Sequence, residues 1–273
     1  PSVREALIYM LNFEWINRTL YNGLYSRTQS YFERSYLASS GKPADDTEKA
    51  LLAKFPQAVR PEFMDGSYRF PVSDGSGQNR ANQKTAFEIL TKAGYTLRDG
   101  RMVNATSGTP LSFEILANNN AQEALLLSFA RSLEPLGIAA RVRVVDSAQY
   151  QERVSTYDYD MIQNTWTSSL SPGNEQLFRW SAANVKNKGS YNFAGVENAA
   201  ADAMIDAMLA AETETGFISA VRALDRVLLS GDYVIPLFYT PHQWVAHWSR
   251  VKHPSKTPVF GYTIDAWWVE DKS

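Results

Sequence analysis

The sequence predicts an α/β fold in which a mixed sheet is flanked by helices. Strand-like and helix-like segments alternate between residues 111 and 165, which is the pattern of βαβ units. The 273 residues are 44% hydrophobic, enough to bury a sizeable core. The chain has no cysteine, so disulfides, thiol catalysis and thiolate metal sites are excluded.

The N-terminal part predicts three helices around an aromatic loop. Residues 2–20 are expected to form two short helices with apolar residues on one face, and Asn12 is placed to cap the second. Residues 22–42 set four aromatic rings among Ser, Arg and Gly, which is typical of a loop anchored by its rings. A short helix is expected near residues 47–54, before Pro56.

The middle of the chain gives the clearest pattern. Asn79 is expected to begin a helix that Gly94 ends. The Asp99–Gly100 pair predicts the turn of a hairpin. A strand, a helix, a strand, a helix and a further strand are then expected at residues 111–117, 121–136, 138–145, 147–154 and 157–165.

The last third changes in character. Two helices at about 197–211 and 215–229 carry Ala, Met, Leu and Val at three-to-four spacing, and we expect them to cover the sheet. Residues 233–239 are a strand-like apolar run. From about Trp244 the periodicity is weak although Trp and Pro continue, so a separate tail is expected.

The segment after the strand at 157–165 is the best candidate for ligand contact. It is a polar loop with one large aromatic, Trp166, whose indole buries a large area, stacks on planar groups and offers one donor. The same stretch holds short polar side chains that could bind a ligand, namely Asn164, Ser168, Ser169 and Asn174. The alternatives are a core tryptophan and ordinary loop or cap residues.

Two further candidates lie outside this loop. Arg153 could hold a ligand carboxylate with its guanidinium, although an ion pair with Asp158 or Asp160 is the favoured role. Tyr25, like its neighbours Tyr31 and Phe32, could line the mouth of a cleft, and anchoring the loop is the favoured alternative.

Several stretches resemble the family 5 extracellular solute-binding proteins of ABC importers. PSVREALIYMLNFEWINRTLYNG is similar to the helix pair that opens their C-terminal lobe, and YQERVSTYDYDM to a segment in the middle of the family. SLSPGNEQ is similar to the subfamily of oligopeptide and microcin C binding proteins that serves the Yej-type importer. The resemblance covers essentially the whole chain.

The resemblance implies a periplasmic-binding-protein type II-like lobe whose N-terminal lobe is missing. Residues 1–245 would be the C-terminal ligand-binding lobe, and residues 246–273 a return segment that completes the absent lobe. The start PSVREAL has no initiator methionine or signal-peptide pattern, so we expect a longer exported precursor. The implied function is a periplasmic component that binds oligopeptides or modified peptides between two lobes and delivers them to ABC permease subunits.

One position departs from the family pattern. Many peptide-binding relatives carry an Asp three residues after the tryptophan, where it binds the terminal ammonium of the peptide. Ser169 stands there in this chain. Recognition of a free peptide N-terminus is therefore not expected.

Other function classes are disfavoured by charge and spacing. The net charge of −2 and the lack of a long basic run argue against nucleic acid or an anionic membrane as partner. The apolar runs are far shorter than the roughly 20 residues of a membrane span. The three histidines lack the spacing of known metal sites and no G-x-S-x-G elbow occurs, so neither an enzyme nor a metal or other cofactor is expected.

The alternative interpretation is carbohydrate recognition. Trp166 could serve as a sugar platform in an oligosaccharide-binding protein or in a domain of a carbohydrate-active enzyme. A carboxylate pair for glycoside hydrolysis, such as Glu175 with Asp160, remains open because its separation depends on the fold.

Overall fold

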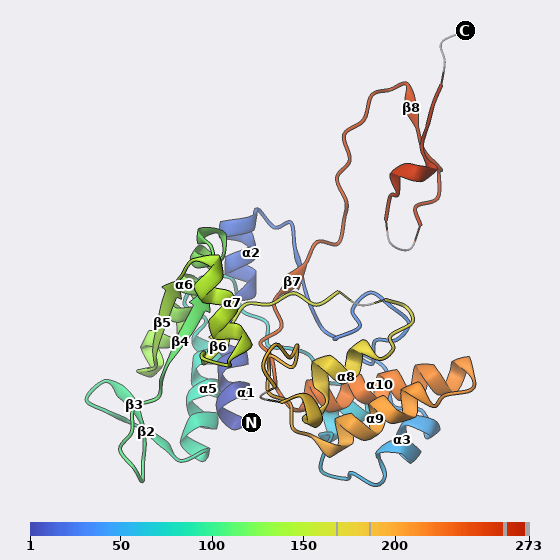
Figure 1. The fold of residues 1–273 in the computed structure, drawn as a ribbon. Coiled ribbons are helices and arrows are strands. Elements are labelled where there is room, and N and C mark those ends of the chain that lie inside the picture. The colour runs from blue at the N-terminus through green and yellow to red at the C-terminus, as the bar shows by residue number, and fades with distance from the viewer. Residues whose placement is uncertain (168, 186, 259–260, 271–273) are drawn as a thin grey trace.

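The computed structural model describes residues 1–167, 169–185, 187–258 and 261–270. Figure 1 shows two bodies side by side and an extended tail that leaves them. The first, here called the α/β body, consists of α1 (Ser2–Met10), α2 (Phe13–Tyr21), α5 (Arg80–Lys92), β2 (Tyr95–Arg98), β3 (Arg101–Asn104), β4 (Ser112–Ala117), α6 (Asn120–Leu133), β5 (Ala139–Val144), α7 (Ser147–Ser155) and β6 (Met161–Ile162). The second, here called the helical body, consists of α3 (Asp46–Leu52), α4 (Pro61–Met64), α8 (Glu175–Trp180), α9 (Ala199–Leu209) and α10 (Glu214–Ser230).

The sheet of the α/β body is parallel and has the order β5-β4-β6. Strands β4 and β5 pair in register from Ser112–Ala139 to Ala117–Val144. Helix α6 and the short turn η1 (Glu134–Leu136) connect them, so the βαβ unit predicted from the sequence is confirmed. Asn119 caps α6 by accepting a hydrogen bond from the Gln122 amide.

The core of this body lies between its helices and the sheet. Helix α1 packs on α5, and α6 packs on β4 and β5. The residues that meet in the middle are buried and apolar, and they include Leu7, Met10, Leu90, Ile115, Leu125 and Leu133. Burying a leucine or isoleucine of this kind contributes roughly 1.5–3 kcal/mol to stability.

The hairpin of β2 and β3 extends from the α/β body, as the Asp-Gly pair predicts. Asp99 and Gly100 both have positive φ, at 49° and 74°, the backbone of a type I′ turn. The Met102 amide donates to the Gly137 carbonyl at 2.8 Å, which ties the hairpin to the end of η1.

The helical body has a core of its own. Helices α9 and α10 pack on each other and on α3. Their apolar residues close a second buried cluster, which includes Met204, Ile205, Met208, Val221, Leu224 and Leu228. The expectation that these two helices cover the sheet was therefore wrong, because their apolar faces are buried against each other and against α3.

A buried arginine on α10 connects this helix to α3, to α4 and to the chain just before α3. Arg226 is 1% exposed and pairs with Glu48, which is fully buried. The same guanidinium donates to the carbonyls of Lys42 and Phe63. Breaking such a pair by removing one partner costs about 3–5 kcal/mol, because the other charge stays buried.

A small apolar cluster joins the two bodies. It consists of Ile8 on α1, Phe63 on α4, Leu229 on α10 and Phe70, which lies in the loop after α4. Beside it, Arg60 holds the buried Asp232 carboxylate with two hydrogen bonds of 2.7 and 3.2 Å. The bodies therefore form a packed junction.

Two predicted strands are much shorter than expected. The strand predicted at 157–165 is reduced to β6, and Tyr157 at its predicted start has a φ of 58°, in the left-handed region. The run at 233–239 is reduced to β7 (Phe238–Tyr239), which pairs antiparallel with β1 (Ser26–Arg27). Residues 22–42 otherwise form irregular turns as predicted, and we call them the aromatic loop.

The tail leaves the bodies after β7 (Figure 1). It ends in an antiparallel pair, β8 (Val251–Lys252) with β9 (Trp268–Val269), and in the turn η3 (Ile264–Ala266). Trp244 and Trp248 are 65% and 76% exposed. None of the helices in the described ranges has the length and apolar character to cross a membrane.

Candidate ligand-binding site

Residues 163–174 carry most of the predicted contacts and cross from one body to the other. This segment, here called the crossing loop, leaves the sheet at β6 and reaches the helical body at α8 (Figure 1). The aromatic loop runs close to it on the helical side. Ser168, one of the predicted contacts, lies outside the described residues.

Trp166 lies half-buried on the helical body. Its ring centroid is 5.1 Å from that of Trp180 with a tilt of 42°, and Trp180 meets Tyr31 edge-on at 5.0 Å. The indole N–H of Trp166 is buried and has no hydrogen-bond partner within the described part of the chain. A buried donor without a partner costs about 1–3 kcal/mol, so this group is suited to a carbonyl oxygen that a ligand brings.

The polar candidates of the crossing loop are accessible. Asn164 is half-buried beside β6, whereas Ser169 and Asn174 are exposed. The Ser169 hydroxyl accepts a hydrogen bond from the Ser171 amide at 3.1 Å, which tightens the turn. Asn174 occupies the N-cap position of α8, and its side chain makes no cap hydrogen bond. The structure thus brings Ser169 and Asn174 to one exposed stretch.

Carboxylates around the crossing loop have structural partners. Glu175 accepts the Gly173 amide with both oxygens at 3.0 Å; burial opposes the shift, but these hydrogen bonds lower its pKa. Asp160 accepts the Glu114 amide at 2.8 Å on the α/β body. Glu175 therefore closes the start of α8 while Asp160 extends the sheet edge, and this arrangement does not favour the two as a hydrolytic pair.

Arg153 is placed as a cross-link. Its guanidinium contacts Glu114 on β4 at 2.8 Å and Asp158 at 2.7 Å. The hydrogen bond to Glu114, more than that to Asp158, raises the Arg153 pKa above its usual value. The pair with Asp158 corresponds to the role favoured from the sequence. With two carboxylates already bound, this arginine is occupied in fixing α7 to the sheet.

Tyr25 lies apart from the crossing loop. It packs against Tyr21 at 5.0 Å and against Phe238 of β7 at 4.7 Å, while Phe32 is buried in the helical core. These contacts are those of loop anchors. Tyr31 alone of the three approaches the predicted site, through its edge-on contact with Trp180.

Sequence reasoning missed one residue that contacts the crossing loop. Tyr36 is 44% exposed, and its hydroxyl donates to the Leu170 carbonyl at 3.2 Å. The sequence shows only one more ring in an aromatic loop. The contact joins residues 134 positions apart, and no local pattern encodes such a pairing.

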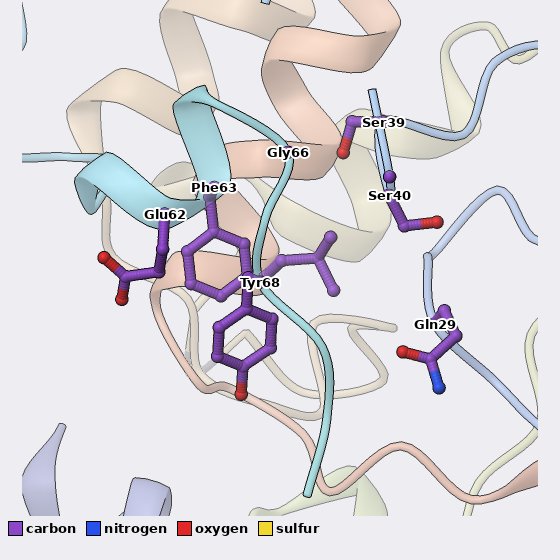
Figure 2. A pocket seen from close by; sticks show the side chains of 9 residues that line it. Gln29, Ser39, Ser40, Glu62, Phe63, Gly66 and Tyr68 are labelled. Carbon is purple, nitrogen blue, oxygen red and sulfur yellow. The ribbon is translucent and has the colours of Figure 1, made fainter. Parts of the chain in front are cut away.

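The cavity shown in Figure 2 is too small to be the ligand site. Its volume is about 10 Å³, and the side chains around it include Gln29, Ser39, Phe63 and Tyr68. Such a volume has room for about one water molecule. Phe63 and Tyr68 are stacked at 4.1 Å beside it.

The family assignment rests on comparison with known sequences. A sequence model described as "Bacterial extracellular solute-binding proteins, family 5 Middle" matches residues 1–188. The chain belongs to this family. It is 52% identical over 266 residues to a binding protein of Brucella suis biovar 1, and 45% identical over 267 residues to the peptidoglycan-binding protein YepA of Agrobacterium fabrum. These matches cover 97% and 98% of this chain but 43% of each relative, so the chain spans less than half their length.

Two solved structures share the fold of this chain. The oligopeptide-binding protein AppA of Bacillus subtilis, in complex with a nonapeptide, matches 99% of this chain and 47% of its own with a TM-score of 0.66 and 19% identity. A periplasmic oligopeptide-binding protein of Thermotoga maritima with bound mannohexaose matches 88% of this chain and 41% of its own, with a TM-score of 0.62 and 20% identity. The chain thus has the fold of one part of these longer proteins.

Proposed function

We propose that this chain is the C-terminal ligand-binding lobe of a periplasmic substrate-binding component of an ABC importer. It would bind oligopeptides or modified peptides against a complementary N-terminal lobe and deliver them to the permease subunits. The observation that carries the proposal is the crossing loop of this family 5 chain, where Trp166 holds a buried indole N–H without a partner in the described ranges.

The chemistry of the loop suits the main chain of a peptide. The Trp166 indole would donate to a peptide carbonyl, and the exposed Ser169 and Asn174 would exchange hydrogen bonds with further peptide groups. Such contacts recognise the main chain and the size of a peptide rather than one of its side chains. The site would therefore accept peptides of many different sequences. Because Ser169 carries no charge, the interior of a peptide is the expected contact rather than its terminal ammonium.

Modified peptides are included because of one relative. YepA of Agrobacterium fabrum is named a peptidoglycan-binding protein, and the peptides of peptidoglycan are attached to sugars. A polar loop beside an indole can meet both a peptide group and a sugar face.

Binding would require two lobes that close on the ligand. We propose residues 1–245 as one lobe and residues 246–273 as a return segment that completes the other. The exposed tryptophans of the tail and its separation from both bodies support this division. Closure would bend the chain near Pro1 and near residues 244–248, where few residues absorb the change in backbone angles.

An oligosaccharide is the second candidate ligand. The specific observation in its favour is the mannohexaose bound to the Thermotoga maritima relative. Trp166 would then stack on a sugar ring. In either case the protein binds and releases its ligand without breaking a bond, so it is proposed as a binding protein and not as an enzyme.

Native mass spectrometry of the two-lobed protein, purified gently from its own cells, tests the proposal. A ladder of co-purified peptides is the expected result, and it would also report their length. A sugar adduct would select the second candidate. An empty protein whose melting temperature rises neither with a peptide library nor with mannohexaose would contradict both.

A further inference from the structure

We propose that Tyr36 is a positioning residue of the ligand site: its hydroxyl holds the crossing loop at Leu170, and its exposed ring forms a wall of the binding surface. Only the second part, the wall of the binding surface, rests on the proposed function. The hydrogen bond from the Tyr36 hydroxyl to the Leu170 carbonyl, at 3.2 Å, is the contact from which it starts.

The backbone of Tyr36 is held in place from behind. Its carbonyl accepts hydrogen bonds from the Nε and Nη2 atoms of Arg222 at 3.1 and 2.7 Å, and a longer one from Lys42 Nζ at 3.5 Å. The next residue, Leu37, is completely buried. The backbone of Tyr36 therefore cannot move away from its place without breaking contacts made by two cations and one core side chain, and its hydroxyl is held at the crossing loop by Leu170.

The segment around Tyr36 is fixed at both ends by one carboxylate. Asp225, fully buried on α10, accepts hydrogen bonds from the Ser30 hydroxyl, the Tyr31 amide and both the amide and hydroxyl of Ser39, at 2.7 to 2.9 Å. Residues 30–39 are thereby closed into a loop over α10. Its conformation is set before any ligand arrives.

An exposed ring in so constrained a place indicates a recognition role. A tyrosine that is 44% exposed adds little to the core, yet this one is supported by a buried carboxylate and two cations. A rigid aromatic loses little conformational entropy when a ligand binds, which is the advantage of a preorganised site. Its planar face suits a peptide group or an apolar side chain of the ligand.

The crossing loop depends on this tyrosine from its other side. Trp166 and Trp180 hold the start of the loop and α8 to the helical body. Leu170, between them in the sequence, is held by Tyr36. Loss of the hydroxyl should free the stretch around Leu170 while Trp166 stays in place.

Hydrogen exchange tests the first half of the inference without a ligand. We compare Tyr36→Phe with the wild type, and use Tyr95→Phe on the β2–β3 hairpin as the matched control. Exchange of the amides of Ser169, Leu170, Ser171 and Gly173 should be about 2- to 10-fold faster in Tyr36→Phe, with the melting temperature unchanged in both variants. Unchanged exchange in that stretch would overturn the positioning role.

Affinity in the two-lobed protein tests the second half. A defined library of tri- to nonapeptides serves as probe, with mannohexaose beside it. Tyr36→Ala should weaken binding about tenfold or more and Tyr36→Phe less, with Tyr95→Phe like the wild type. If the wild type binds a probe and Tyr36→Ala binds it equally well, the wall role is overturned. If the wild type binds no probe, the proposed function fails, and the exchange result still decides whether Tyr36 positions the loop.

Discussion

At the scale of single residues, Trp166 combines a structural contact with an unused donor. Its ring packs on Trp180, so part of it belongs to the helical core. Its indole N–H is buried without a partner in the part of the chain described. The core interpretation is therefore confirmed for the ring, and ligand contact stays a prediction for the indole N–H.

Trp166→Phe should separate these two roles. Phenylalanine keeps a ring against Trp180 but has no N–H, so the melting temperature should hardly change. In the two-lobed protein, peptide affinity should fall roughly 3- to 10-fold, the value of about one net hydrogen bond. Tyr95→Phe on the β2–β3 hairpin is the control for isothermal titration. Equal affinity of Trp166→Phe and the wild type would show that the donor is not used.

Arg27 is a buried arginine with few hydrogen-bond partners for its charged guanidinium. It is 8% exposed, and its Nε and Nη2 atoms are buried without hydrogen-bond partners among the residues described. Only Nη1 donates, to the Pro71 carbonyl at 2.6 Å. Burial lowers the pKa of the Arg27 guanidinium to about 10, although Glu14 nearby opposes this.

This arginine gives a prediction with a definite pH dependence. A base whose pKa falls on folding destabilises the folded state while it is charged. The penalty is complete below the folded-state pKa of about 10, and it is relieved as the pH rises through that value towards the higher pKa of the unfolded chain. Arg27→Met removes the penalty, so its melting temperature should equal or exceed that of the wild type at pH 8. The advantage should shrink at pH 11, and an advantage that grows there would contradict the assignment.

At the scale of secondary structure, sequence patterns correctly predicted the elements whose conformation is determined by their own residues. The βαβ unit, the Asp99–Gly100 hairpin and the paired helices α1 and α2 were all predicted from periodicity and turn chemistry. The strand expected at 157–165 is reduced to two residues, and the alternating pattern does not reveal the positive φ of Tyr157 at its start. Helix α8 was missed because a six-residue element gives almost no periodicity.

Partners of an element were harder to predict than the element itself. The apolar spacing of α9 and α10 correctly gave two helices, but it does not say what buries them. For the site, Trp166 stood out because a polar loop surrounds it. Tyr36 did not stand out, because the residues that fix it and its loop are distant in the sequence. Only the fold brings Leu170, Arg222 and Asp225 near.

Gly137 offers a test of how hairpin and sheet are joined. It has a φ of 72°, and a Cβ there would lie 2.7 Å from both the Gly100 carbonyl oxygen and the Met102 amide nitrogen. Gly108 has the same φ but open space around it. Gly108→Ala should lose about 1–2 kcal/mol from backbone strain alone, and Gly137→Ala about 2–5 kcal/mol because the hairpin must also move. Urea unfolding measures both, and equal losses would show that the hairpin is not docked there.

At the scale of the whole molecule, the tail does not contribute to either core. The exposed Trp244, Trp248 and Trp268 lie on a segment that Figure 1 shows away from both bodies. Its internal contacts include one aromatic cluster around Trp267 and the β8–β9 pair. The large apolar surface on it calls for a partner, which the proposed second lobe would supply.

Removing the tail should therefore leave the bodies intact. A chain ending at residue 245 is expected to melt within about 2 °C of the whole chain and to be more monodisperse by light scattering. A chain ending at residue 231 is the control, because it also loses Asp232 and β7 and should melt several degrees lower. A large drop on removing residues 246–273 alone would show that the tail belongs to the first lobe.

The route of the chain between the two cores has a consequence for its synthesis. Ala6 and Ala86 are buried in the same cluster, although 80 residues separate them in the sequence. At about 5–20 residues per second, the apolar face of α1 waits roughly 4–16 s on the ribosome for α5 to appear. The helical core waits longer still, since α3 meets α10 only after residue 230 has been made. We therefore expect the nascent chain to stay open and dependent on chaperones for seconds.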